Sequence, residues 1–179
     1  EMKVRDPKRV INDNGHFQLG NHVFRDSTRG RGYGPVDMHR SIVVSSDVYY
    51  YSLAQDMGID RIHDFMKPFG FGQITGIDLV GEARGILPSR EWKQRRFKQR
   101  WAQGDTISIG IGQGYNAFTI LQLAHAVATL ANDGIVMKPH LVKKIINSKT
   151  GEEEIVAKDP VDVIPLKKEN VNFIKRAMQ

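Results

Sequence analysis

Apolar residues recur at helical spacing in several parts of this chain, most regularly over residues 119–131. Thr119 suits the N-cap position of that segment, and Asn132-Asp133-Gly134 ends it. The spacing predicts a core helix, whose alanines allow another helix to approach closely. Similar patterns predict further helices over residues 36–44, 48–58, 61–69, 90–100 and 168–179.

Alternating apolar and polar residues mark the predicted strands. Residues 16–19 and 23–25 alternate on either side of a turn at Gly20-Asn21. Residues 135–146 and 152–156 flank a polar segment with a glycine, which predicts a β-hairpin near the C-terminal end. The remaining long segments predict no regular element: residues 70–82 and 104–114 are glycine-rich, and residues 157–168 form a linker with two prolines. The pattern is that of a mainly helical α+β chain.

The polar run Ser45-Ser46-Asp47 lies between two predicted helices. Residues two apart are splayed on a helix, whereas in an extended or turn backbone they share a face. If Ser45 and Asp47 act together, they must therefore lie in the loop, where Asp47 can cap the following helix. We expect that helix to end at Gly58, a residue type that accepts the left-handed conformation. On these three residues alone, a simple capped helix start is the favoured interpretation.

Composition limits the possible functions. With 40% hydrophobic and 26% charged residues among 179, the chain can form one domain with a core, or one lobe of a larger domain. The formal net charge of +6 suits nucleic acid, an anionic membrane or cell-wall polymer, or no specific partner. The absence of cysteine excludes disulfides and thiolate metal sites. No apolar run approaches the length of a membrane span.

The cations are densest in residues 90–100, where they alternate with aromatic residues. This composition is typical of a nucleic-acid surface, because cations neutralise phosphates and rings stack on bases. A surface helix that buries its aromatic ridge and solvates its charges is the favoured interpretation, since no nucleic-acid-binding signature accompanies it. In the glycine-rich loop, Asp78 and Glu82 could form an acid–base pair, although such carboxylates more often bind backbone amides.

Several motifs together resemble the penicillin-binding D,D-transpeptidases, in particular the class B enzymes of bacterial cell elongation. They run in the family's order over about residues 10–145 and comprise Ser45-Ser46-Asp47, Gln55-Asp56-Met57-Gly58-Ile59, Gly76-Ile77-Asp78-Leu79, Pro88-Ser89-Arg90-Glu91-Trp92-Lys93, Gly104-Asp105-Thr106, Gly112-Gln113-Gly114-Tyr115 and Leu130-Ala131-Asn132-Asp133-Gly134. The resemblance implies the mainly helical portion of the penicillin-binding transpeptidase or serine β-lactamase-like fold, with the central sheet largely missing. Residues 1–179 would be a partial domain without the Ser-x-x-Lys part and the Lys-Thr-Gly strand, and we expect it to expose apolar surface.

The resemblance also implies a serine acyl-enzyme mechanism for the intact protein. A serine attacks the D-Ala-D-Ala carbonyl of a peptidoglycan stem peptide, and the acyl group passes to an amine of a neighbouring strand. Ser45 and Asp47 match the family's second catalytic motif, in which Ser45 would hydrogen-bond the lysine of Ser-x-x-Lys and relay a proton to the leaving amine. Asp47 stands where many relatives have asparagine. We expect it to be held by backbone amides, or to orient Ser45 without touching that lysine.

The implied ligands are stem peptides and β-lactams, and the implied partners are membrane proteins of the elongation complex. No cofactor and no nucleic acid are implied, and the intact protein would work at the periplasmic face of the inner membrane, with its anchor outside this chain. The alternative function is a non-catalytic binding module that uses residues 90–100 to contact a protein, the cell wall or nucleic acid.

Two further family features are expected to be absent. Lys149-Thr150-Gly151 matches the third motif by its letters, but its polar neighbours predict an exposed hairpin turn without a catalytic role. Some relatives bind structural zinc through two aspartates, a histidine and a cysteine. Asp13 and Asp26 match the aspartates, while Tyr33 and Ser46 stand at the other positions, so we expect no zinc there. The nearby histidines are more typical of surface or core positions than of ligands: His16, His22 and His39.

Overall fold

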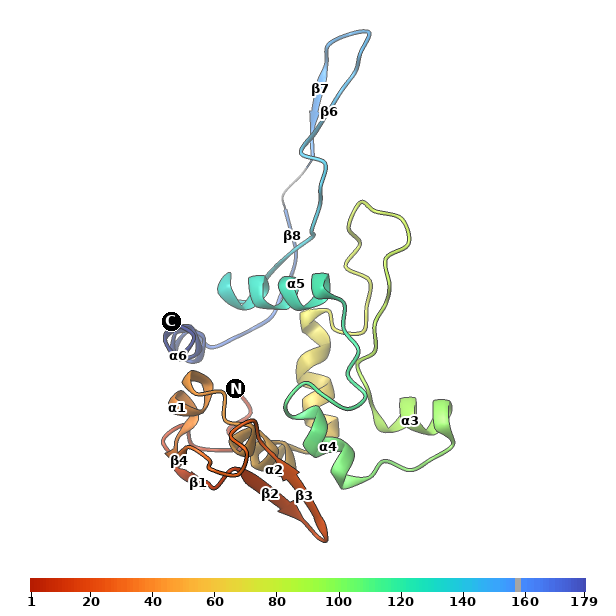
Figure 1. Ribbon diagram of the computed structural model, residues 1–179. Coiled ribbons are helices and arrows are strands. Elements are labelled where there is room, and N and C mark those ends of the chain that lie inside the picture. Colours follow the sequence, from red (N-terminus) through yellow and green to blue (C-terminus); the bar gives the residue numbers. More distant parts are fainter. Residues whose placement is uncertain (157–158) are drawn as a thin grey trace.

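A computed structural model of the chain describes residues 1–156 and 159–179. Its elements gather around the long helix α2 (Asp47–Met66), which packs most extensively against α4 (Gln103–Ile109) (Figure 1). Near the N-terminus, α1 lies beside the last helix, α6. The remaining helices are α1 (Met38–Val43), the short 3-10 helix η1 (Lys67–Phe69), α3 (Arg90–Phe97), α5 (Ile120–Ala131) and α6 (Lys168–Ala177).

The strands that the structure describes form four separate antiparallel pairs. The pairs are β1 (Ile11–Asp13) with β4 (Gly34–Val36), β2 (His16–Leu19) with β3 (His22–Arg25), β5 (Ile135–Met137) with β8 (Pro160–Val163), and β6 (Lys144–Ile146) with β7 (Glu153–Ile155). Leu19 pairs with His22, which confirms the two-residue turn at Gly20-Asn21. The β6–β7 hairpin projects far from the helices (Figure 1). Helices with short strand pairs and no larger described sheet confirm the predicted α+β class.

The start of α1 differs from the prediction. The predicted helix begins at residue 36, but Val36 lies in β4 opposite Ile11, and Pro35 precedes it opposite Asn12. Proline cannot donate to a ladder, and it is tolerated because β4 is an edge strand. The helix begins after Asp37, whose carboxylate accepts the N–H of Arg40 at 2.8 Å and so caps it.

The beginning of α2 also corrects the prediction, whereas its middle agrees with it. Ser46, not Asp47, is the N-cap, because its hydroxyl oxygen accepts the N–H of Tyr49 at 3.2 Å. Gly58 has the expected positive φ (74°) and a non-helical ψ (159°), so the first helical segment of α2 ends there, as predicted. α2 therefore contains two helical segments on either side of Gly58, and the second ends at Met66, where η1 replaces the last turn of the helix predicted over residues 61–69.

Three other element boundaries differ from those predicted. The predicted helix 90–100 ends at Phe97, where Lys98 takes a left-handed conformation. The first half of the glycine-rich stretch 104–114 is helical, as part of α4. The predicted linker contains β8, which pairs with β5, so only part of the predicted strand 135–146 belongs to the hairpin. Residues 157 and 158 of that linker lie outside the described residues.

One hydrophobic cluster lies between η1, the face of α5 that carries Ala126, and the β5–β8 pair. Its buried members are Phe69, Phe71, Ala126, Val136 and Ile164. The capping box at Thr119, whose hydroxyl accepts the N–H of Gln122, confirms the predicted start of this core helix. Two apolar residues of the same helix, Leu123 and Val127, are exposed, as expected for a partial domain.

Gly110 ends α4 where that helix meets α2. A Cβ at this position would overlap the Cβ of Ala54 and lie 3.0 Å from the carbonyl oxygen of Tyr50. Gly110→Ala should therefore lower the free energy of unfolding by about 1–3 kcal/mol, because the helices must separate. Gly104→Ala is the matched control within α4, since its nearest contact would be 3.7 Å, and it should be neutral or stabilising by about 0.5–1 kcal/mol. Urea unfolding followed by circular dichroism measures both, and equal effects would contradict the close contact.

Candidate active site

The chain reverses between α1 and α2 through a Schellman turn at Ser45. The N–H of Ser45 donates to the carbonyl of Ile42 at 3.2 Å, and the N–H of Ser46 donates to the carbonyl of Ser41 at 2.9 Å. This pattern places Ser45 at the left-handed position that glycine usually takes, and its φ is 55°. A residue with a Cβ pays about 1–2 kcal/mol for this conformation. Backbone strain therefore coincides with a predicted catalytic residue, as is common at functional sites.

Ser45 and Asp47 lie on either side of the buried Ser46. Ser45 is exposed in the turn, as predicted, whereas Asp47 is half-buried and belongs to the first turn of α2. The hydrogen bonds of the described residues do not join their side chains. The expectation that both lie in the inter-helix loop is thus met by Ser45 alone, and their joint catalytic role stays a prediction.

The carboxyl group of Asp47 faces other carboxylates. Burial raises its pKa, and the charges of Asp26 and Asp13 raise it further. Within the part of the chain that the structure describes, Asp47 accepts no backbone-amide hydrogen bond. The structure thus does not support the expectation that amides hold Asp47.

Ser46 is the residue whose role the sequence did not reveal. Its hydroxyl caps α2 and donates to Oδ2 of Asp13 at 2.5 Å. Ser46 is fully buried and Asp13 is 1% exposed. The other oxygen of Asp13 accepts the N–H of Gly15 at 2.8 Å. The end of β1 and the start of α2 are therefore joined by a buried, satisfied network.

The second predicted aspartate, Asp26, is bound separately. One of its oxygens accepts from the N–H and the hydroxyl of Thr28, at 2.9 and 2.5 Å. Among the residues that the structure describes, no group of three or more His, Cys, Asp and Glu side chains is arranged to hold a metal ion. Two of the nearby histidines contact aromatic rings edge to face, His22 with Phe24 and His39 with Phe173.

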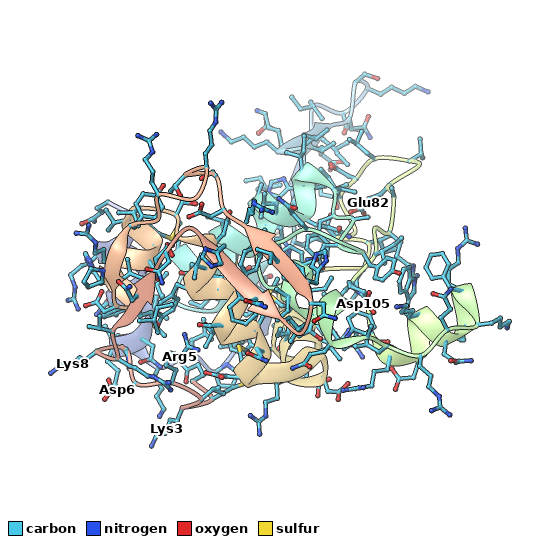
Figure 2. The ribbon with its side chains drawn as sticks, turned by 60° about the horizontal axis from the view of Figure 1, so that its bottom comes forward. Lys3, Arg5, Asp6, Lys8, Glu82 and Asp105 are labelled. Atoms are coloured by element: carbon cyan, nitrogen blue, oxygen red, sulfur yellow. The ribbon has the colours of Figure 1, made fainter. Side chains whose placement is uncertain are left out.

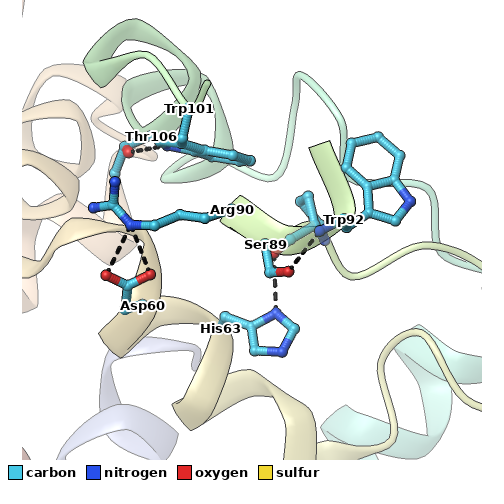
Figure 3. Close-up of polar contacts among 8 residues, drawn as sticks. Asp60, His63, Ser89, Arg90, Trp92, Trp101 and Thr106 are labelled. Atoms are coloured by element: carbon cyan, nitrogen blue, oxygen red, sulfur yellow. Dashed lines mark hydrogen bonds and ion pairs between the residues drawn. The ribbon is translucent and has the colours of Figure 1, made fainter. Parts of the chain in front are cut away.

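The segment around α3 is fixed to α2 and α4 by several polar contacts (Figure 3). Arg90 Nε lies 2.9 Å from both carboxylate oxygens of Asp60. Ser89 is the N-cap of α3, since its hydroxyl accepts the N–H of Trp92 at 3.1 Å. Two side chains complete the attachment by donating from a ring nitrogen: His63 to the carbonyl of Pro88 at 3.0 Å, and Trp101 to the hydroxyl of Thr106 at 2.8 Å.

Lys93, at the centre of the basic segment, is turned inward. It is only 5% exposed and pairs with Asp105 at 2.5 Å, beside the rings of Trp101 and Tyr115. Asp105 lies next to α3 (Figure 2). The hydrogen bond to Asp105 raises the pKa of Lys93. The structure therefore corrects the predicted surface helix in part, because Lys93 is buried while Phe97 is 45% exposed and Trp92 is half-buried. The other five cations of the segment are exposed to solvent: Arg90, Arg95, Arg96, Lys98 and Arg100.

The whole chain, residues 1–179, matches the family model of the penicillin binding protein transpeptidase domain. The chain belongs to this transpeptidase family. It is 49% identical over 144 residues to the peptidoglycan D,D-transpeptidase MrdA of Haemophilus influenzae, which covers 79% of the chain and 22% of that relative. It is 52% identical over 111 residues to MrdA of Escherichia coli K12, which covers 62% of the chain and 18% of that relative.

Solved structures agree with this membership. PBP2 of Pseudomonas aeruginosa, in complex with WCK 5153, superposes with a TM-score of 0.85 at 42% identity and covers 98% of this chain and 39% of that one. PBP2 of Helicobacter pylori, in complex with MreC, superposes with a TM-score of 0.80 at 29% identity and covers 97% of this chain and 31% of that one. The family and the fold inferred from the motifs are thereby confirmed. The transpeptidase chain described here spans about a fifth of the length of the curated relatives it matches.

Lys149-Thr150-Gly151, which has the letters of the transpeptidases' third motif, lies exposed in the turn of the β6–β7 hairpin. The N–H of Gly151 donates to the carbonyl of Asn147 at 2.8 Å and closes the turn. The predicted exposed turn is thus confirmed. No helix among the described residues of this transpeptidase chain is both long and apolar enough to span a membrane.

The other carboxylate pair does not form a joint site. Asp78 accepts the amides of Leu141 and Val142, and these hydrogen bonds lower its pKa. Glu82 (labelled in Figure 2) accepts the amide of Thr75 at 2.7 Å and a second amide at 3.0 Å. Burial acts to raise the pKa of Glu82, but these hydrogen bonds outweigh it and lower the pKa. Each carboxylate therefore binds backbone amides of a loop, which is the interpretation that the sequence favoured.

Proposed function

We propose that this chain is part of a peptidoglycan D,D-transpeptidase that cross-links stem peptides during cell elongation and is inhibited by β-lactams. The family match along all 179 residues carries the proposal. The MrdA relatives, at 49% and 52% identity, support this reaction class.

In this function Ser45 is the catalytic residue that the chain contributes, with Asp47 beside it. The exposed hydroxyl of Ser45 would accept a hydrogen bond from the lysine of the Ser-x-x-Lys motif and pass a proton to the leaving amine. The 179 residues contain no Ser-x-x-Lys sequence. We therefore place the nucleophile, its lysine and the Lys-Thr-Gly strand in parts of the protein outside residues 1–179, which form a partial transpeptidase domain.

The proposal includes a location and partners. The Helicobacter pylori PBP2 structure is a complex with MreC, which supports partners from the elongation complex. Stem peptides are the substrates, and the intact enzyme works at the periplasmic face of the inner membrane. We assign no separate binding function to α3, because two of its cations are already paired with Asp60 and Asp105.

Fluorescent penicillin tests the proposed function. The whole protein that contains this chain should form a covalent band that excess unlabelled penicillin prevents. The 179-residue chain alone should form none, because acylation needs the nucleophile. A stable band on the chain alone would contradict the placement of the nucleophile. No band on the folded whole protein would contradict the function.

A further inference from the structure

One buried hydrogen bond ties the Ser45 turn to a strand far away in sequence. Ser46 and Asp13 are 33 residues apart, and both are less than 2% exposed. The Ser46 hydroxyl accepts the N–H of Tyr49 and donates its proton to Asp13, so its only donor is used. Since Ser46 directly follows Ser45, whatever fixes Ser46 also limits the backbone of Ser45.

The surroundings of Asp13 leave it little freedom. A Cβ on Gly32 would overlap the carbonyl oxygen of Asp13, so the loop before β4 packs directly on the end of β1. Thr28 secures that loop, since its hydroxyl accepts the N–H of Gly32 at 2.7 Å and donates to Asp26. The backbone N–H of Asp26 also donates to the carbonyl of Gly15 at 3.1 Å, and Gly15 is the residue whose N–H binds Asp13. Asp13, which accepts the hydrogen bond from Ser46, is therefore held by the loop at Gly32 on one side and by the turn at Gly15 on the other.

These residues do not fit the zinc that some members of the family bind here. Zinc in proteins prefers nitrogen and sulfur ligands, whereas the four matching positions supply two carboxylates, a hydroxyl and a phenol. Both oxygens of Asp13 already accept hydrogen bonds, and the Ser46 oxygen points its proton at one of them. A metal shared by these two oxygens would have to replace this hydrogen bond.

We propose that the Ser46–Asp13 hydrogen bond holds the catalytic turn without a metal, and that Asp13 is a positioning residue for Ser45. The inference rests on the proposed function, because the positioning serves the role of Ser45 in acylation. The strained left-handed backbone of Ser45 would change to a more favourable conformation unless neighbouring contacts hold it. The hydrogen bond from the Ser46 N–H to the Ser41 carbonyl holds the turn on the α1 side, and the hydrogen bond from the Ser46 hydroxyl to Asp13 holds it on the β1 side. Without the Asp13 acceptor, the buried Ser46 hydroxyl is unsatisfied and the turn loses its second support.

The test compares variants of the whole protein. Asp13→Asn keeps the size of the side chain but replaces one of its two acceptor oxygens by an NH2 donor, so it cannot accept from both the Ser46 hydroxyl and the Gly15 N–H. Ser46→Ala removes the hydroxyl and keeps the Asp13 side chain. Asp60→Asn is the matched control, because it makes the same chemical change on the exposed side of α2. Reaction with fluorescent penicillin is separated into a dissociation constant and an acylation rate constant. Thermal unfolding and bound zinc are measured on the same samples.

We expect Asp13→Asn and Ser46→Ala to lower the acylation rate constant by about 10- to 100-fold, because a small displacement of a catalytic group is that costly. The dissociation constant should stay the same, and Asp60→Asn should match the parent protein. The parent should contain well under one zinc per chain, and a chelator should not change its rate.

The outcomes separate the two proposals. If the folded parent protein is not acylated, the proposed function fails. If the parent is acylated and folded Asp13→Asn reacts at the parental rate, the positioning role is wrong. Equal losses in binding and in rate would also overturn it, since they indicate general damage. If Asp13→Asn does not fold, Ser46→Ala decides the question. One zinc per parent chain, or loss of acylation with a chelator, would overturn the metal-free turn.

Discussion

Replacing Ser45 by glycine should make the protein more stable and less reactive at the same time. Glycine accepts the φ of 55° without the steric penalty, so the free energy of unfolding should rise by about 1 kcal/mol. Loss of the hydroxyl removes the proposed proton relay, so acylation of the whole protein by penicillin should fall about 10²- to 10⁴-fold. Thermal unfolding and penicillin labelling measure the two effects.

Two controls separate strain from chemistry. Ser45→Ala removes the hydroxyl but keeps a Cβ in the left-handed position, so the rate should fall without the gain in stability. Lys98→Gly relieves a similar left-handed residue, with a φ of 58°, on the exposed end of α3. It should raise stability and leave acylation unchanged. If Ser45→Gly keeps the parental rate, Ser45 is not the catalytic residue that we propose.

Elements with local signals were predictable from the sequence. The Gly20-Asn21 turn joins two alternating strands, and the capping box at Thr119 is complete within four residues. The elements that were missed depend on distant partners. β8 is a strand because β5 lies beside it, and Pro35 is extended because it pairs with Asn12. Such pairings leave no periodic pattern in segments of three or four residues.

The candidate site likewise has features that local sequence predicts and features that depend on distant residues. Ser45 could be selected from its motif, and its position in a turn followed from the helices on either side. The choice between Ser46 and Asp47 as the cap could not be made locally, because serine and aspartate cap helices about equally well. The acceptor that orients the Ser46 hydroxyl is Asp13, on another element, so the fold makes that choice.

Replacing Asp105 by alanine is the second change with a large expected effect. Lys93 is 5% exposed, and its Nζ lies 2.5 Å from Asp105, 5.3 Å from the Tyr115 ring centre and 5.9 Å from that of Trp101. Asp105→Ala leaves this buried cation without its counter-charge, so the free energy of unfolding should fall by about 3–5 kcal/mol. Because Asp105 raises the pKa of Lys93, the pair contributes its stability below the ordinary lysine pKa and loses it only as the pH rises through the raised value.

Lys93→Met in the Asp105→Ala background supplies the decisive comparison. Methionine fills the space between the rings without a charge, and replacing a buried ion pair by apolar groups is often close to neutral. The double variant should therefore recover most of the loss, except about 1 kcal/mol for the N–H of Ala102, which Asp105 accepts at 2.8 Å. Urea unfolding of the parent, both single variants and the double variant gives the coupling energy. Additive losses would show that Asp105 acts only as the cap of α4, whereas recovery would identify the buried charge as the source of the effect.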